Sequence, residues 1–209
     1  MTDIHQKVKD IKQSFRLTMD GATAQSMRDK GLDYKLNWGT TLPRLKEMAH
    51  DLKAGTDDNY DLAIALWKED VRECKILATM LMPAEKMPPE VADIWMEQTT
   101  HLEIAEQAAF NLYQHLPYAA DKAFQWLASE NDLTQICGYH TLSRLFRRQM
   151  EPNERGINEF IDQAISALKS NNIHLKKAAM ASLQHFAGLS LMHQRIAQSA
   201  TRQAGFNFL

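Results

Sequence analysis

The chain has 209 residues, of which 44% are hydrophobic and 24% charged, as is usual for one soluble globular domain. The first residues are polar, and no apolar run approaches the ~18 residues of a membrane-spanning helix, so the sequence predicts a cytoplasmic protein without a signal peptide or membrane anchor. The net charge of −2 argues against a constitutive nucleic-acid binder.

Twelve helices are predicted, and no stretch shows the alternation of a β-strand. Proline marks several breaks: Pro43 follows a helix N-cap at Thr41, Pro83 ends the run VRECKILATMLM, Pro89 opens EVADIWMEQ, and Pro152 precedes a helix near Glu154. In chain order the predicted helices span residues 3–18, 21–30, 41–53, 58–68, 69–82, 88–98, 101–115, 117–128, 132–149, 153–169, 172–187 and 189–203.

A loose repeat runs through these helices. Trp95, Trp126 and Leu168 are each followed seven residues later by a leucine, and these anchors lie 31 and 42 residues apart. Each repeat is interpreted as a helix that ends in a bulky apolar residue, a short polar turn, and a second helix with small residues on one face. Such pairs must stack to bury their apolar sides, which predicts a curved stack of antiparallel helix pairs. An irregular helical bundle is the alternative.

Single residue types fit this interpretation. Trp67, Trp95 and Trp126 should close the first helices of pairs and be mostly buried. Cys74 and Cys137 are far apart and are predicted to be reduced and buried. Methionines at 80, 82, 87 and 96 are predicted to fill gaps in the core.

Three segments carry a resemblance to a known family: MRDKGLDYKLNWGTTLPRLKEMA (27–49), LAIALWKEDVRECKILATMLM (62–82) and DKAFQWLASENDLTQICGYHTL (121–142). With LKKAAMASLQHF they resemble the DNA alkylation repair family over roughly residues 25–187. The middle segment, with its Leu-Trp, acidic turn and Arg-Glu, is the most specific. The resemblance implies an all-α, HEAT-like α-α superhelix, expected here as one domain over residues 1–209.

The resemblance also implies a function. Family members cradle duplex DNA on a concave basic surface, and many are glycosylases that release positively charged alkylated purines. It further implies catalysis by an Asp and a Trp on one helix, with an Arg and a second Trp on later helices. A carboxylate can stabilise the oxocarbenium-like sugar, aromatic faces favour a cationic base, and arginine holds a backbone phosphate.

The chain departs from this pattern at the catalytic positions. Leu102 stands where the family has Trp, and Glu106 stands where it has the catalytic Asp, so Glu106 is the candidate catalytic residue. The family's Trp-x-Arg-Arg turn corresponds to LTQI (133–136). In the later run KAAMASLQ (177–184), Lys177 is kept, whereas Trp and Arg are replaced by Ala181 and Gln184. Glycosylase activity is therefore expected to be weak or lost.

Metal and cofactor sites are not predicted. Glu47 and His50 have the Glu-x-x-His spacing of di-iron bundles, but no second such motif follows. Glu97 and His101 lie four residues apart without a third ligand. No glycine-rich phosphate loop or nucleophile elbow is present. Surface pairs and solvated faces are the simpler interpretation.

The distribution of basic residues instead predicts that the chain binds a polyanion. Residues 133–209 carry nine Lys/Arg against four Asp/Glu, whereas residues 1–132 carry 15 against 22. Arg144, Arg147 and Arg148 lie together on one helix, and Lys176 and Lys177 lie one repeat later. Because equivalent positions of successive repeats share a surface, they are predicted to form one strip for DNA phosphates. Solvated helix faces, or ion pairs to the acidic residues at 151 and 154, are the alternative.

The sequence therefore predicts a protein related to DNA repair that binds duplex DNA without sequence specificity. A non-catalytic helical-repeat scaffold for a protein or peptide partner is the alternative. A continuous basic groove would favour the first function, and an apolar or acidic groove the second.

Overall fold

The computed structural model describes residues 4–55 and 59–207. These residues form twelve α-helices and two short 3-10 helices, with no β-strand among them. The predicted all-α, HEAT-like fold is confirmed. No helix within the described ranges is long and apolar enough to cross a membrane.

Two compact units make up the chain, residues 1–112 and 113–209. The first contains α1 (Ile4–Leu17), α2 (Gly21–Asp29), α3 (Leu42–Ala54), α4 (Tyr60–Trp67), α5 (Arg72–Leu81), η1 (Ala84–Lys86), α6 (Pro89–Glu97) and α7 (Leu102–Asn111). The second contains η2 (Tyr113–His115), α8 (Ala119–Leu127), α9 (Asp132–Arg147), α10 (Glu154–Leu168), α11 (Ile173–Ala187) and α12 (Leu191–Gln203). That residues 1–209 act as a single domain stays a prediction.

Most helix boundaries follow from local chemistry. Residues 3 and 58 of the predicted ranges lie outside the described residues. Pro43 and Pro89 occupy the first turns of α3 and α6, and Met82 ends α5 before Pro83. Asn153 caps α10 by accepting a hydrogen bond from the backbone N–H of Gly156 at 2.8 Å. One predicted helix is too long: residues 101–115 form α7 to Asn111 and then the separate turn η2.

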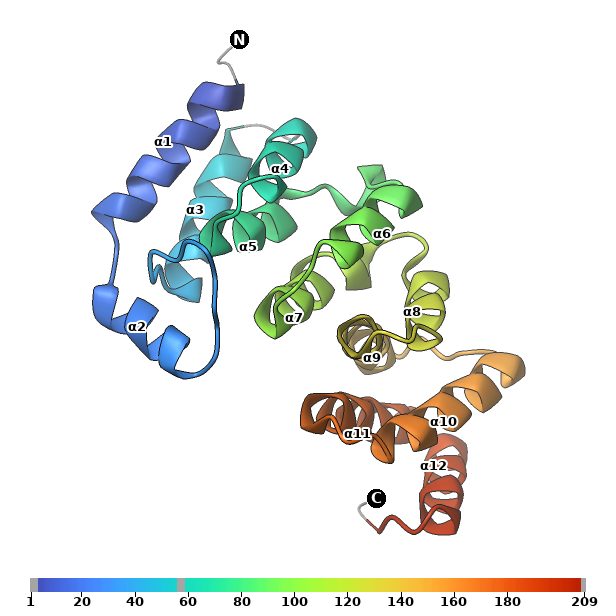
Figure 1. Ribbon diagram of the computed structural model, residues 1–209. Coiled ribbons are helices and arrows are strands. Elements are labelled where there is room, and N and C mark those ends of the chain that lie inside the picture. Colours follow the sequence, from blue (N-terminus) through green and yellow to red (C-terminus); the bar gives the residue numbers. More distant parts are fainter. Residues whose placement is uncertain (1–3, 56–58, 208–209) are drawn as a thin grey trace. The chain divides into compact units, whose positions relative to one another are not determined.

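In each unit the helices pack in two rows, as a helical repeat requires (Figure 1). In the first unit, α3, α5 and α7 lie side by side in one row, with α1 and α4 in the other. In the second unit, α9 and α11 lie side by side, α8 packs against α9, α10 packs against α11, and α12 covers α10 and α11. The second helices of successive pairs therefore form a continuous row within each unit.

Contacts one repeat apart confirm the predicted spacing. Trp67 Nε1 donates to Gln98 Oε1 at 2.8 Å across 31 residues, and Ser143 Oγ lies 2.6 Å from His185 Nδ1 across 42 residues. These separations equal the two intervals between the sequence anchors.

The predicted core residues are buried. Trp67, Trp95 and Trp126 are 2%, 2% and 4% exposed, and both cysteines and the four clustered methionines are buried. The rings of Trp67 and Trp95 stack with centroids 4.1 Å apart, which joins α4 to α6. The tryptophans therefore link successive helix pairs, as their positions at the ends of first helices predict.

A buried ionic network fixes the segment between α2 and α3. Arg72, at the start of α5, forms two hydrogen bonds with Glu103 on α7 and one with the backbone oxygen of Thr40. Tyr34 donates to the same Glu103 carboxylate at 2.8 Å. Glu73 accepts from the backbone N–H of Thr40 at 3.2 Å. The Arg-Glu pair of the second family-like segment thus binds segment 33–40 to two helices.

Candidate nucleic-acid interface

Helices α9 and α11 run parallel and form the row on which the predicted binding residues lie. Asn131 and Asn172 cap their N-termini, and the Asn172 side chain also donates to the Asp132 carboxylate at 2.8 Å. Near the other ends, Ser143 of α9 contacts His185 of α11. Two contacts at matching ends fix the register, so a residue on α9 lies beside the residue 40 to 42 positions later on α11.

An aromatic cluster holds the C-terminal ends of these two helices together. Phe146 of α9 and Phe186 of α11 lie 5.5 Å apart, and each lies 5.1 Å from Phe160 of α10, measured between ring centroids. All three side chains are fully buried. Aromatic pairs at such separations add to the energy of apolar burial. The surface above them is therefore carried on a rigid support.

Two arginines and two histidines lie in the C-terminal halves of α9 and α11. Arg144 and Arg147 stand in the last turn of α9, where the helix dipole favours positive charge. Burial, followed by the charge of Arg147, lowers the pKa of Arg144. Burial, followed by the charges of Arg147 and Arg144, lowers the pKa of His185. Burial and Arg144 lower the pKa of His140 to about 4. The part of each pKa shift that comes from a neighbouring arginine shows that the electrostatic potential here is positive. A bound anion would be attracted to this potential.

The charge of Arg147 is available to a ligand. Its side chain is exposed. In the described part of the chain, neither Arg147 nor Arg148 forms an ion pair, so the alternative pairing with the acidic residues at 151 and 154 does not occur there. Arg148, although exposed, donates from Nη1 to the backbone oxygen of Gln114 at 2.8 Å, which fixes its guanidinium beside η2.

Lys176 and Lys177 lie at the other end of the row. They stand in the first turns of α11, and Lys177 precedes His185 by eight residues, or about 12 Å along the helix axis. By the register, their neighbours on α9 are residues 134–137 and not Arg144. The structure therefore brings Arg144 and Arg147 together with His185, and places the two lysines in a separate group on the same row.

Glu106, the candidate catalytic residue, is exposed on α7 in the first unit. Glu103, one turn earlier, points inward to Arg72 and is 17% exposed. Leu102 is the first residue of α7 and is half-buried. The side chain of Gln135 donates to the backbone oxygen of Ser129 at 2.5 Å, so it stabilises the start of a helix where the family has an arginine.

Sequence reasoning missed His140, Ser143 and His185. The 42-residue interval between Trp126 and Leu168 could have predicted the contact, because Ser143 and His185 are separated by the same interval. The same 42-residue interval places Phe186, and not the lysine pair, beside Arg144.

Other predicted constellations belong to the first unit. Glu47 and His50 are both exposed on α3. His101 stacks on Tyr34 at 3.9 Å, and its Nε2 lies 3.0 Å from the backbone oxygen of Asp33. No group of three metal-binding side chains occurs in residues 4–55 and 59–207.

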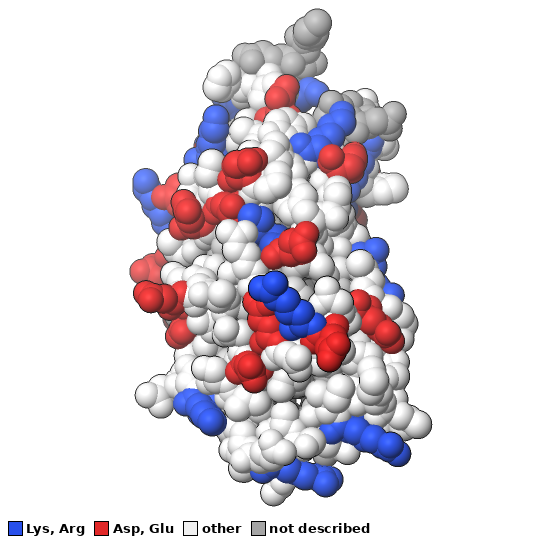
Figure 2. All heavy atoms as spheres, turned by 90° about the vertical axis from the view of Figure 1, so that its right-hand side faces the viewer, with Lys and Arg blue, Asp and Glu red and all other residues white. Residues whose placement is uncertain are grey.

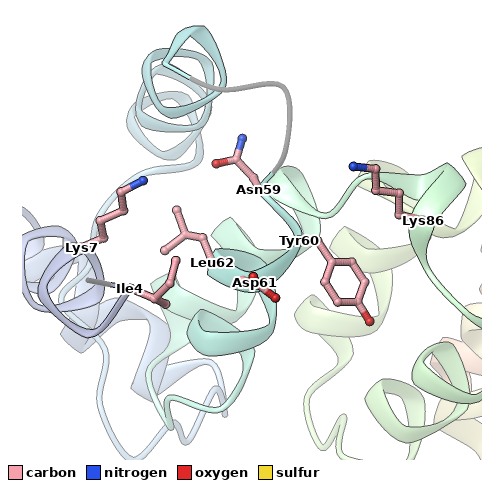
Figure 3. A pocket seen from close by; sticks show the side chains of 7 residues that line it. All are labelled: Ile4, Lys7, Asn59, Tyr60, Asp61, Leu62 and Lys86. Atoms are coloured by element: carbon pink, nitrogen blue, oxygen red, sulfur yellow. The ribbon is translucent and has the colours of Figure 1, made fainter. Parts of the chain in front are cut away.

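A pocket of about 440 Å³ lies between α1, the start of α4, and η1, with Lys7 and Lys86 on opposite sides (Figure 3). Asp61 also lines it. Its mixed charges define no class of ligand. On the face shown in Figure 2, acidic side chains are interspersed with Lys and Arg.

Comparisons with known proteins agree with the fold. Residues 11–188 match the family described as DNA alkylation repair enzyme. A solved structure from a new family of proteins related to the HEAT-like repeat DNA glycosylases, with affinity for branched DNA structures, superposes with a TM-score of 0.82. The two sequences are 16% identical, and the alignment covers 94% of this chain and 83% of that one. No curated protein sequence matched the chain.

Proposed function

The chain belongs to the family of DNA alkylation repair enzymes, and from this premise we propose that it binds DNA through the row formed by α9 and α11. Arg144 and Arg147, with His185 beside them, are proposed to hold one backbone phosphate region. Lys176 and Lys177 are proposed to hold another. Base excision is proposed to be weak or lost. The observation that carries the proposal is the pair of arginines in the last turn of α9, Arg144 and the exposed Arg147, above the aromatic cluster that holds α9 and α11 together.

Spacing supports this division into two groups. The groups lie about 12 Å apart along the helix axis, which corresponds to about three to four base pairs at about 3.4 Å each. Each arginine presents planar donors that suit a phosphate, whereas each lysine acts as a point charge. Contacts of this kind carry no base information, so the binding should be independent of sequence. The solved relative's affinity for branched DNA supports DNA as the class of ligand.

A titration of fluorescently labelled duplex at several salt concentrations tests the proposal. We expect Arg144→Ala/Arg147→Ala to weaken binding and to reduce the slope of log K against log salt by about 0.9 for each phosphate that is no longer neutralised. Lys176→Ala/Lys177→Ala should have a similar, separate effect. Arg195→Ala/Arg202→Ala is the matched control, because it removes two exposed charges from α12 in the same unit.

The control should bind as the parent protein does. If the Arg144/Arg147 variant also binds as tightly as the parent, with the same salt slope, this end of the row is not the DNA site. A four-way junction beside a linear duplex of equal length would show whether the chain shares the relative's preference.

A further inference from the structure

A second basic surface lies in the first unit, on α1. His5, Lys9, Lys12 and Arg16 follow the spacing i, i+4, i+7 and i+11, which places them on one side of the helix. Together with Trp38 they line a pocket of about 370 Å³. This volume lies within the range of small-molecule sites. Basic side chains and an aromatic ring thus share one recess of nucleotide size.

Two of these charges are available. Lys12 donates to Glu69 at 2.7 Å, so this pair is neutral overall. Lys9 and Arg16 are exposed, and within the described ranges neither forms an ion pair. They flank Lys12 along the helix. A bound anion would therefore meet two uncompensated positive charges beside a neutral pair.

Trp38 is held firmly at this recess. Its backbone N–H donates to the buried Glu73 at 3.1 Å, and its backbone oxygen accepts from Asp20 at 3.0 Å. Gly39 follows with φ of 74°, and a Cβ there would lie 2.1 Å from the backbone oxygen of Asp20. The backbone of residues 38–39 is therefore fixed by the same network that holds Arg72. Trp38 is also the one tryptophan of the four that is not buried.

We propose that this recess binds a nucleotide of single-stranded nucleic acid, with its base against Trp38 and its flanking phosphates beside Lys9 and Arg16. A positive surface that tracks the backbone and an aromatic face that stacks a base are the two components of sequence-tolerant single-strand binding. The proposal rests on the proposed function and extends it to single-stranded nucleotides, such as those at a junction or a damaged site, and to a second surface, in the first unit.

Tryptophan fluorescence gives a direct test, because the other three indoles are buried. Titration of the full chain with a ten-residue oligothymidylate should quench the emission in a saturable way. Trp38→Leu should remove the quenching and weaken binding of a labelled oligothymidylate, followed by anisotropy, by at least about fivefold. Lys9→Ala/Arg16→Ala should weaken binding and reduce the salt slope by about 1.4, at about 0.7 for each phosphate neutralised on a single strand.

Lys7→Ala is the matched control, because Lys7 lies on the same helix but lines the other pocket. It should bind the oligonucleotide as the parent does, and thermal melts should show that every variant is folded. Unchanged affinity in both Trp38→Leu and Lys9→Ala/Arg16→Ala would overturn the proposal. Equal competition by poly-glutamate would also overturn it, because the surface would then be a general site for polyanions. Neither result would affect duplex binding through Arg144 and Arg147, which is measured separately.

Discussion

Arg72 and Glu103 form a bidentate ion pair that joins α5 to α7. Nε of Arg72 donates to Oε2 of Glu103 at 2.8 Å, and Nη2 donates to Oε1 at 2.5 Å. The Arg72 side chain is 1% exposed, and its remaining terminal nitrogen reaches the Thr40 backbone oxygen and Glu73. Although burial opposes ionisation of Glu103, the hydrogen bonds and charge of Arg72 hold the pKa of that carboxyl below its ordinary value. One guanidinium therefore forms hydrogen bonds with two carboxylates and a backbone oxygen.

Removal of this guanidinium should be severely destabilising. Arg72→Ala leaves the carboxylates of Glu73 and Glu103 without their cation in the interior, and we expect a loss of about 3–5 kcal/mol in the free energy of unfolding. Arg72→Lys should recover only part of it, because one ammonium cannot reproduce the planar pair of bonds. Urea denaturation measures both values. A loss below about 1 kcal/mol for Arg72→Ala would show that the network contributes little.

The stacked indoles of Trp67 and Trp95 should be coupled energetically. Their ring planes differ by 2°, and both side chains are buried. Either one changed to Ala should cost about 3–5 kcal/mol. In a double-mutant cycle with leucine at both positions, the two losses should interact by about 0.5–1.5 kcal/mol. Strictly additive losses in thermal or urea unfolding would mean that the stack itself adds nothing beyond burial.

The fold could be predicted from the sequence because its signals are local. Pro83 and Pro89 end and begin helices by geometry that needs no partner, and the asparagine before α10 caps its own helix. The bulky residues at 31- and 42-residue intervals indicate the repeat in the same way. The end of α7 could not be predicted, because the pattern through residue 115 stays helical while Leu112 leaves the helical conformation before η2.

The site could be predicted less well because it depends on register between helices. Arg144 and Lys176 belong to successive repeats, and the sequence prediction places them together for that reason alone. It does not consider how far along its own helix each residue lies. The Ser143–His185 contact sets this axial offset and moves the lysines to the opposite end of α11. The ionic network of Arg72 is a similar case: Arg72 and Glu103 are separated by 31 residues, and only their packing makes them partners.

His140 should make the protein less stable in mild acid. Burial, with help from Arg144, holds its pKa at about 4, below the ordinary 6.5 of an unfolded chain. Between these values the unfolded state binds the proton and the folded state does not, so the free energy of unfolding falls as pH drops from about 6.5 to about 4. The loss is on the order of 3 kcal/mol. His140→Gln should flatten stability over this window, as measured by urea midpoints at stepped pH. An NMR titration that placed the His140 pKa near its ordinary value would contradict this.

Base excision provides the last prediction: release of 7-methylguanine from duplex DNA should be far slower than for a family member with the full catalytic set, or absent. Glu106 is exposed and could still present a carboxylate to a developing positive sugar. However, a displacement of about 1 Å can cost about 100-fold, and glutamate is one methylene longer than the family's aspartate. The family's aromatic residues would each contribute about 0.5–2 kcal/mol to a cationic base, and Leu102 and Ala181 offer no such face. These losses act on one transition state and should compound. Clear release by the parent that disappears in Glu106→Gln would make Glu106 the catalytic residue and contradict the prediction.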